Sequence, residues 1–163
     1  MKWGVVVFPG SNDDRDVHHV LTRVLGQEAR FLWHREPDLH GCRCVVLPGG
    51  FSYGDYLRPG AMAKFSEIMT AIVRFAHHGG TVLGICNGFQ ILCEAGLLPG
   101  TLIRNRSLRF VCREVSVRVE TAATRFTTAC HPKETLRLPI KHGEGCYFAP
   151  RSEERRVGKE CRL

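Results

Sequence analysis

Three short apolar runs, each leading into a glycine-containing turn, constrain the fold of this chain most strongly. The runs cover Lys2–Phe8, Cys42–Leu47 and Thr81–Ile85. Between them, apolar residues recur at helical spacing over residues 13–25 and 65–76, and glycines follow both stretches. Alternating strand and helix patterns predict an α/β domain, and fully apolar strands are typical of a parallel sheet. We therefore expect a three-layer α/β/α fold with a mostly parallel central sheet.

The pattern changes after Leu98-Pro99-Gly100. Three shorter strands are predicted at residues 110–119, 126–129 and 136–140, with no helix between them. This part of the chain therefore predicts an antiparallel extension or flap. A further strand at residues 29–33 completes the parallel part, and no internal repeat or interdomain linker interrupts the chain.

Composition excludes several classes of protein. A chain of 163 residues with 44% hydrophobic content predicts one globular domain, and no apolar run is long enough to span a membrane. The net charge of +7 comes from basic residues interleaved with acidic ones, so we expect no nucleic-acid partner. The eight cysteines lie singly in apolar contexts, and Cys42 and Cys44 make a poor metal site. We expect reduced thiols, no metal site and a cytoplasmic location.

The stretch Gly84-Ile85-Cys86-Asn87-Gly88-Phe89-Gln90 predicts a nucleophile elbow. An apolar strand ends at a cysteine with a glycine two residues away on either side, and a helical pattern follows. The glycines leave room for a strained turn, and the helix N-terminus favours a thiolate. The alternative is a buried core cysteine, which is the commoner fate of a free cysteine. The strand–turn–helix context favours a cysteine nucleophile for acyl chemistry.

A second glycine-rich loop, residues 48–60, follows another of the strands. In a parallel sheet the carboxyl ends of the strands meet at one edge, so we expect this loop to lie beside Cys86 and offer backbone N–H groups. An ordinary strand-ending turn is the alternative. A thiolate nucleophile normally needs a histidine base, but spacing assigns none of the eight histidines. His142-Gly143-Glu144-Gly145 fits either a histidine–carboxylate pair or a glycine-rich turn.

These residues resemble a known family. The chain is similar to class I (triad-type) glutamine amidotransferases, and among them to the glutaminase subunits of phosphoribosylformylglycinamidine synthase in purine biosynthesis. The resemblance implies a flavodoxin-like α/β/α fold. It extends from residue 1 to about residue 150 and depends on six motifs: residues 9–12, 48–58, 84–90, 96–100, 104–105 and 142–145.

The resemblance implies a glutaminase reaction at Cys86. Cys86 would attack the side-chain amide of L-glutamine, form a glutamyl thioester and release ammonia. The backbone N–H groups of Gly50 and Asn87 would form the oxyanion hole. The residues that the resemblance assigns to glutamine binding are Phe51, Ser52, Gln90 and Arg104.

The resemblance also implies partners. Ammonia would pass to a separate ATP-dependent synthetase subunit that converts formylglycinamide ribonucleotide to its amidine, and a small third subunit would bridge the two in bacteria. The glutaminase subunit would need no cofactor, because ATP and magnesium are used by the synthetase. The segment around His142 and Glu144 would lie near the synthetase interface.

The chain departs from the family pattern near its C-terminus. Family members carry a catalytic histidine and glutamate in a Pro-His-Pro-Glu segment that follows His-Gly-Glu-Gly, and this chain has no such segment. His131-Pro132 precedes His142 and is therefore not assigned as the base. Residues 151–163 resemble translated sequencing adapter, and their five basic and three acidic residues supply +2 of the net charge. We expect residues 1–150 to be a partial amidotransferase domain, incomplete at the C-terminus, with a non-native tail at 151–163.

Without a base, Cys86 would depend on the helix dipole alone, so we expect no useful glutaminase activity from this chain. Two other readings stay open at this point. One is another cysteine hydrolase of similar fold, which labelling of Cys86 by a glutamine analogue would distinguish. The other is a non-catalytic remnant that only docks on the synthetase, which co-purification without ammonia production would support.

Overall fold

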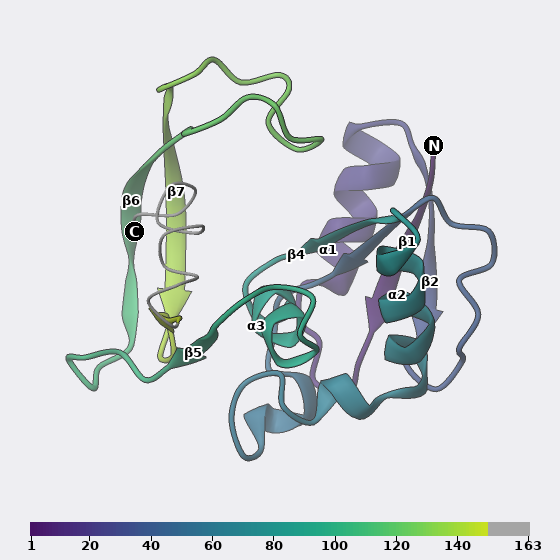
Figure 1. Ribbon diagram of the computed structural model, residues 1–163, viewed down its shortest axis with the longest axis horizontal. Helices are drawn as coiled ribbons and strands as arrows, with labels where there is room; N and C mark the ends of the chain where they lie inside the picture. The colour runs from purple at the N-terminus through teal and green to yellow at the C-terminus, as the bar shows by residue number, and fades with distance from the viewer. Residues whose placement is uncertain (150–163) are drawn as a thin grey trace. The chain divides into compact units, whose positions relative to one another are not determined.

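The computed structural model describes residues 1–149, and these divide into two units, Met1–Thr101 and a second that begins at Leu102. The first unit is built on a four-stranded sheet (Figure 1). Its strands are β1 (Lys2–Val7), β2 (Glu28–Trp33), β3 (Cys44–Leu47) and β4 (Thr81–Gly84). The order is β2-β1-β3-β4, and every pairing is parallel, as the sequence predicted.

The strand register brings three loops to one edge of this sheet. β1 pairs with β3 through Val5 and Val46, and β3 pairs with β4 through Leu47 and Gly84. The segments that follow β1, β3 and β4 therefore leave the sheet side by side. This edge carries residues 9–13, 48–56 and 85–87; the sequence predicted that the loop after β3 and Cys86 would lie together, but did not include residues 9–13.

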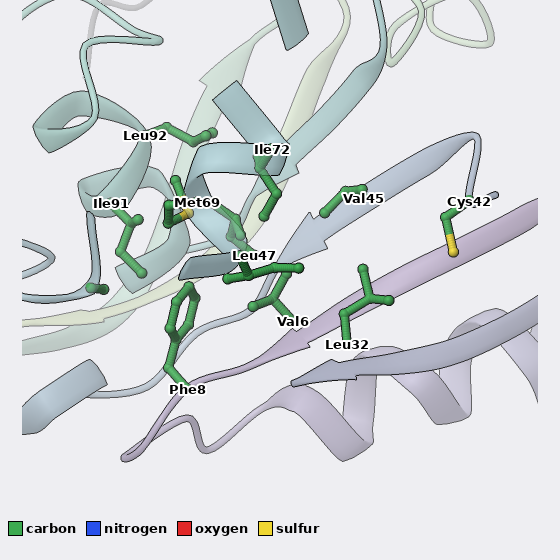
Figure 2. Packing of buried hydrophobic residues seen from close by; sticks show 12 residues of the cluster. Val6, Phe8, Leu32, Cys42, Val45, Leu47, Met69, Ile72, Ile91 and Leu92 are labelled. Atoms are coloured by element: carbon green, nitrogen blue, oxygen red, sulfur yellow. The ribbon is translucent and has the colours of Figure 1, made fainter. Parts of the chain in front are cut away.

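Helices cover both faces of the sheet. On one face, α2 (Glu67–His77) and α3 (Asn87–Glu94) pack against the sheet, with the fully buried Ile68, Ile72 and Ile91 in a core that also holds Val6, Val45 and Leu47 (Figure 2). On the other face, α1 (Asp14–His19) and the π-helical turn η1 (Val20–Val24) place Leu21 against Val5 and Val46. Adjacent residues of β1 and of β3 thus serve opposite faces, as the pleat of a strand requires. The predicted three-layer α/β/α fold is confirmed.

The loop after β3 contains two short 3₁₀ segments, η2 (Ser52–Asp55) and η3 (Ala63–Phe65). In the second unit, β5 (Thr101–Ile103) pairs with β8 (Cys146–Phe148), while β6 (Val111–Arg118) pairs with β7 (Thr135–His142). The β6–β7 pairing is antiparallel over the full length of both strands. The predicted antiparallel extension is therefore present.

One predicted strand, residues 126–129, is wrong. Residues 125–129 form turns instead. Thr127 N donates to Thr124 O at 3.1 Å, and the Thr124 and Thr127 hydroxyls lie 2.6 Å apart. Threonine hydroxyls that bond within their own segment compete with strand pairing, and that competition replaces the strand here.

Two further sequence expectations concern the described residues. The seven cysteines among residues 1–149 are all free thiols, in keeping with the expected reduced state. Within the same range, no helix has both the length and the apolar character that crossing a membrane would need. The predicted tail at residues 151–163 lies outside the described residues.

The core that supports the site-bearing edge can be tested at Ile72. Its side chain is fully buried between α2 and the sheet, so Ile72→Ala should lower the free energy of unfolding by about 2–5 kcal/mol. Leu25→Ala is the matched control, because Leu25 is 56% exposed, and its cost should stay within about 0.5 kcal/mol. Chemical denaturation measures both. Equal losses in the two variants would contradict the assignment of this core.

Candidate functional site

Cys86 stands at a sharp turn between β4 and α3. Its backbone has φ 52° and ψ −109°, a conformation that non-glycine residues rarely adopt. Ile85 N donates to Leu47 O at 3.0 Å, which holds the turn against β3, while Phe89 N and Gln90 N donate to Cys86 O. The Cys86 side chain is exposed at the N-terminal end of α3. The predicted nucleophile elbow is present, and the alternative of a buried core cysteine is excluded.

The glycines on either side of Cys86 are needed for close packing. A Cβ on Gly88 would overlap the carbonyl oxygen of Leu47 in β3, and a Cβ on Gly84 would meet the backbone of Gly88 at 2.7 Å. The first turn of α3 thus lies backbone against backbone on the strands. This close approach forces the chain to reverse within a single residue, and that residue is Cys86.

The loop after β3 is tied to the loop after β1. Asn12 N donates to Gly49 O at 3.1 Å, and Phe51 N donates to Gly10 O at 2.9 Å. These two bonds flank an antiparallel bridge between Ser11 and Gly50. The backbone of Gly50 has φ 142°, and a Cβ there would meet Gly10 O at 2.7 Å, so only glycine fits this crossing.

The two backbone N–H groups predicted for the oxyanion hole are not used by the surrounding backbone pairing. In the Ser11–Gly50 bridge the flanking residues make the bonds, so the Gly50 N–H takes no part in it. In the first turn of α3, the N–H groups of the three residues after Asn87 bond to backbone carbonyls. The Asn87 N–H has no backbone acceptor among residues 1–149. Both donors suit an oxyanion, and their role stays a prediction.

The side chain of Asn87 joins the elbow to the glycine-rich loop. It is fully buried, and its Oδ1 accepts a hydrogen bond from Ser52 N at 3.0 Å. Its Nδ2 donates to Asp55 Oδ1 at 3.1 Å and to Gln90 Oε1 at 2.9 Å. One amide therefore fixes both ends of η2 against the start of α3. Sequence reasoning assigned only the backbone of Asn87, because a side-chain contact between distant segments leaves no local pattern.

The predicted glutamine-binding residues fall in different surroundings. Phe51 is 52% exposed, whereas Ser52 is buried and Gln90 is 9% exposed with its Oε1 bonded to Asn87. These three lie in the same unit as Cys86. Arg104 lies in the second unit, where its Nε is 3.9 Å from Glu144 Oε1. The roles of all four in binding glutamine stay predictions.

Asp13, which directly precedes α1, is a charged residue near Cys86 that the sequence did not identify as a site residue. A Cβ on Gly49 would collide with Asp13 Oδ2 and would lie 3.5 Å from Cys86 Cβ. The Asp13 carboxyl and Cys86 therefore approach the same face of Gly49. No local sequence signal identifies Asp13, because its approach to Cys86 depends on the pairing of β1 with β3.

His142 and Glu144 are organised by Asn105 and Arg104 in the second unit. Asn105 is buried; its Oδ1 is 3.0 Å from His142 Nδ1 and accepts Gly145 N at 2.9 Å. Glu144 pairs with Arg104. The segment is thus a turn built around a buried amide, which favours the glycine-turn reading over a histidine–carboxylate pair. No cluster of three or more His, Cys, Asp or Glu side chains able to hold a metal ion occurs in the described part of the chain.

An ion pair anchors the far end of the glycine-rich loop. Arg58 donates to both oxygens of Glu94 at 2.7 Å, and Thr101 Oγ1 donates to Glu94 Oε1 at 3.1 Å. The Glu94 side chain is only 5% exposed. The hydrogen bonds from Arg58 hold the pKa of Glu94 below its ordinary value, although burial opposes this shift. The pair fastens the loop to the last turn of α3.

The chain is similar to known glutamine amidotransferases over most of its length. The model of the CobB/CobQ-like glutamine amidotransferase domain matches residues 1–160. The chain is 60% identical over 148 residues to phosphoribosylformylglycinamidine synthase subunit PurQ of Salinibacter ruber, covering 91% of this chain and 63% of that protein. It is 58% identical over 163 residues to PurQ of Rubrobacter xylanophilus, covering all of this chain and 74% of that protein.

The fold of the chain is also similar to that of a solved structure. The structure of PurLQS from Thermotoga maritima superposes with a TM-score of 0.87 at 46% identity, covering 91% of this chain and 69% of that one. The chain therefore spans between about three fifths and three quarters of the length of these relatives.

The close approach at Gly88 gives a prediction. Alanine is the better helix former by about 1 kcal/mol, yet its methyl group would overlap Leu47 O, so Gly88→Ala should destabilise the protein by about 1–3 kcal/mol. Gly143→Ala is the control, because a Cβ there meets only Phe110 Cδ2 at 3.8 Å. Chemical denaturation compares the two. A Gly88→Ala protein as stable as the parent would show that α3 does not pack this closely.

The Arg58–Glu94 pair gives a prediction about pH. Because the pKa of Glu94 is lowered on folding, the pair stabilises the protein above the unfolded pKa of about 4.3, and this contribution is lost as the pH falls through the folded value. Arg58→Gln should therefore lower the denaturation midpoint at pH 7 and have less effect at pH 3. Arg23→Gln, at an exposed position, is the control and should change neither midpoint. An Arg58→Gln effect that is equal at both pH values would contradict this account.

Proposed function

Because the chain belongs to the family of CobB/CobQ-like glutamine amidotransferase domains, we propose that it is the glutaminase part of phosphoribosylformylglycinamidine synthase. A glutaminase of this kind hydrolyses L-glutamine to glutamate and ammonia, and the ammonia serves purine biosynthesis. The identity of 58–60% to proteins named PurQ supports this choice over another cysteine hydrolase of similar fold.

One observation carries the proposal. An exposed cysteine with φ 52° lies at the N-terminal end of α3, between Gly84 and Gly88. The close packing of α3 on the strands leaves no room for a side chain at either glycine. Cys86 is the N-cap residue of α3, so it lies at the positive end of the helix dipole, and the glycine-rich loop lies beside it at Gly49. A cysteine held in this way suits nucleophilic attack on an amide carbonyl.

The chemistry follows from these positions. The Cys86 thiolate adds to the side-chain carbonyl carbon of glutamine, and the resulting oxyanion accepts hydrogen bonds from Gly50 N and Asn87 N. The C–N bond then breaks, the nitrogen takes up a proton, and ammonia leaves a glutamyl thioester. Water attacks the thioester, which releases glutamate and the free thiol. We assign glutamine contacts to Phe51, Ser52, Gln90 and Arg104.

The partners belong to the same proposal. We assign a synthetase subunit as the acceptor of ammonia and a small third subunit as the bridge between the two, in line with the similarity to PurLQS of Thermotoga maritima. ATP and magnesium act in the synthetase, and this chain needs no cofactor of its own. None of the eight histidines of the chain is assigned as the base that activates Cys86.

Labelling with a glutamine analogue tests the proposal. 6-Diazo-5-oxo-L-norleucine is a glutamine analogue that alkylates thiolates. Alkylation is efficient only where the analogue occupies a glutamine-binding site next to the thiolate. Mass spectrometry of the digested protein should find the adduct on Cys86 and not on the other cysteines. L-Glutamine should slow the labelling about tenfold or more when present well above its dissociation constant, whereas L-asparagine should not.

Cys86→Ser is the matched variant and should take no label. Iodoacetamide, which needs no glutamine site, serves as the control for thiol access. Labelling spread over several cysteines, or labelling that glutamine does not slow, would contradict the proposed function. Glutamate release is measured in parallel; because no histidine of this chain is assigned as the base for Cys86, we expect no turnover above that of Cys86→Ser.

A further inference from the structure

A buried polar network lies under the glycine-rich loop, away from Cys86 itself. His34, directly after β2, is 5% exposed, and its Nδ1 is 2.7 Å from the hydroxyl of Tyr53. The same hydroxyl is 2.9 Å from Oγ of Ser66, which is 7% exposed and precedes α2. Three distant parts of the chain therefore meet at one phenol oxygen.

Backbone hydrogen bonds fix the His34 end of this network. His34 N donates to Val7 O at 3.2 Å, and Ile68 N donates to His34 O at 3.1 Å. His34 is thus held between β1 and the first turn of α2. Its ring lies edge-on to the Tyr53 ring, with the centroids 5.7 Å apart. Because two backbone hydrogen bonds hold His34, its ring is a fixed partner for the Tyr53 hydroxyl.

Tyr53 needs such a support, because its backbone is strained. Its φ is 57°, that of Gly54 is 66° and that of Asp55 is 54°, so three consecutive residues lie in the left-handed region. For a non-glycine residue this conformation is sterically unfavourable. Such strain persists only where surrounding contacts over-determine the conformation. The phenol hydrogen bonds to His34 and Ser66 are contacts of this kind.

The strained segment is bonded to Asn87, the residue that follows Cys86. Ser52 N and Asp55 Oδ1, on either side of Tyr53, both bond to the Asn87 side chain. Tyr53 N donates to Pro9 O at 2.7 Å, and Gly50 lies three residues earlier. A shift of the Tyr53 ring would therefore move the backbone that carries the Gly50 N–H and Phe51.

We propose that His34, Tyr53 and Ser66 form a positioning network that holds residues 49–55 in the geometry required for glutamine to react at Cys86. The inference rests on the proposed function, since it concerns the same site. In this proposal His34 and Tyr53 act through the loop, as positioning residues, by the hydrogen bonds that join them. The network is matched to a neutral imidazole with its proton on Nε2, which accepts the Tyr53 hydroxyl while that oxygen accepts the Ser66 hydroxyl.

The surroundings of His34 favour this neutral form. Burial lowers the pKa of His34, the positive charge of Arg35 lowers it further, and Glu67 opposes the shift. Tyr53, from η2, is the other titratable group in contact with the ring. In the tautomer with its proton on Nε2, the neutral ring accepts at Nδ1, and the donor direction that we assign to the network runs from Ser66 to Tyr53 to His34.

Tyr53→Phe tests the network, because it removes one oxygen and keeps the ring. The rate of Cys86 labelling is measured with 6-diazo-5-oxo-L-norleucine and, separately, with iodoacetamide. We expect the analogue rate to fall on the order of tenfold, because misplaced recognition groups slow a reaction steeply, while the iodoacetamide rate stays within about twofold. His34→Gln should show the same split. Tyr56→Phe, at a 70% exposed position in the same loop, is the control and should change neither rate.

The outcomes separate the two proposals. If the unaltered chain takes no analogue on Cys86, the proposed function fails and this inference fails with it. If the unaltered chain is labelled and Tyr53→Phe is labelled at the same rate, the positioning role alone is overturned. If Tyr53→Phe slows both reagents equally, the hydroxyl supports the fold in general, and the positioning role is again overturned.

Discussion

The close approach of α3 to the sheet is the constraint on which the site depends. At Gly88 the helix lies so near to β3 that a single methyl group would overlap the Leu47 carbonyl oxygen. The chain can enter the helix at this distance only by reversing at Cys86, which explains its φ of 52°. The same approach buries the Asn87 amide, whose three hydrogen bonds then fix the loop after β3. Exposure of the thiol and order in the loop are thus two results of one packing contact.

Much of the fold could be predicted from local pattern, because apolar runs and helical periodicity report directly on burial. The apolar runs that include Val45 and Val46 predicted buried strands, and the helical spacing that includes Ile72 predicted a helix packed on the sheet. In the structure Val45 and Ile72 lie in the core on one face of the sheet, and Val46 lies in the core on the other. The wrong strand at 126–129 shows the limit of this reasoning. There Phe126, Thr127 and Thr128 are residue types that are common in strands, but the hydroxyls of Thr124 and Thr127 bond to each other within a turn. Side-chain competition of this kind is invisible to hydrophobic pattern.

The site divides in the same way. Cys86 and its glycines could be found because an elbow is a local structure with a local signature. The Asn87 side chain, the Asp13 carboxyl and the link between His34 and Tyr53 could not, since each joins segments that only the strand order brings together. A parallel sheet predicts which loops share an edge, but it does not predict which side chains within them meet. Those contacts required the structure.

The central claim is that the elbow and the adjoining loop are built to hold the oxyanion formed when Cys86 attacks glutamine. A crystal structure of the chain after reaction with the diazo-ketone analogue tests this most directly. We expect a covalent bond to the sulfur of Cys86, with the ketone oxygen of the adduct about 2.7–3.1 Å from both Gly50 N and Asn87 N. An adduct whose ketone oxygen points away from both N–H groups would contradict it.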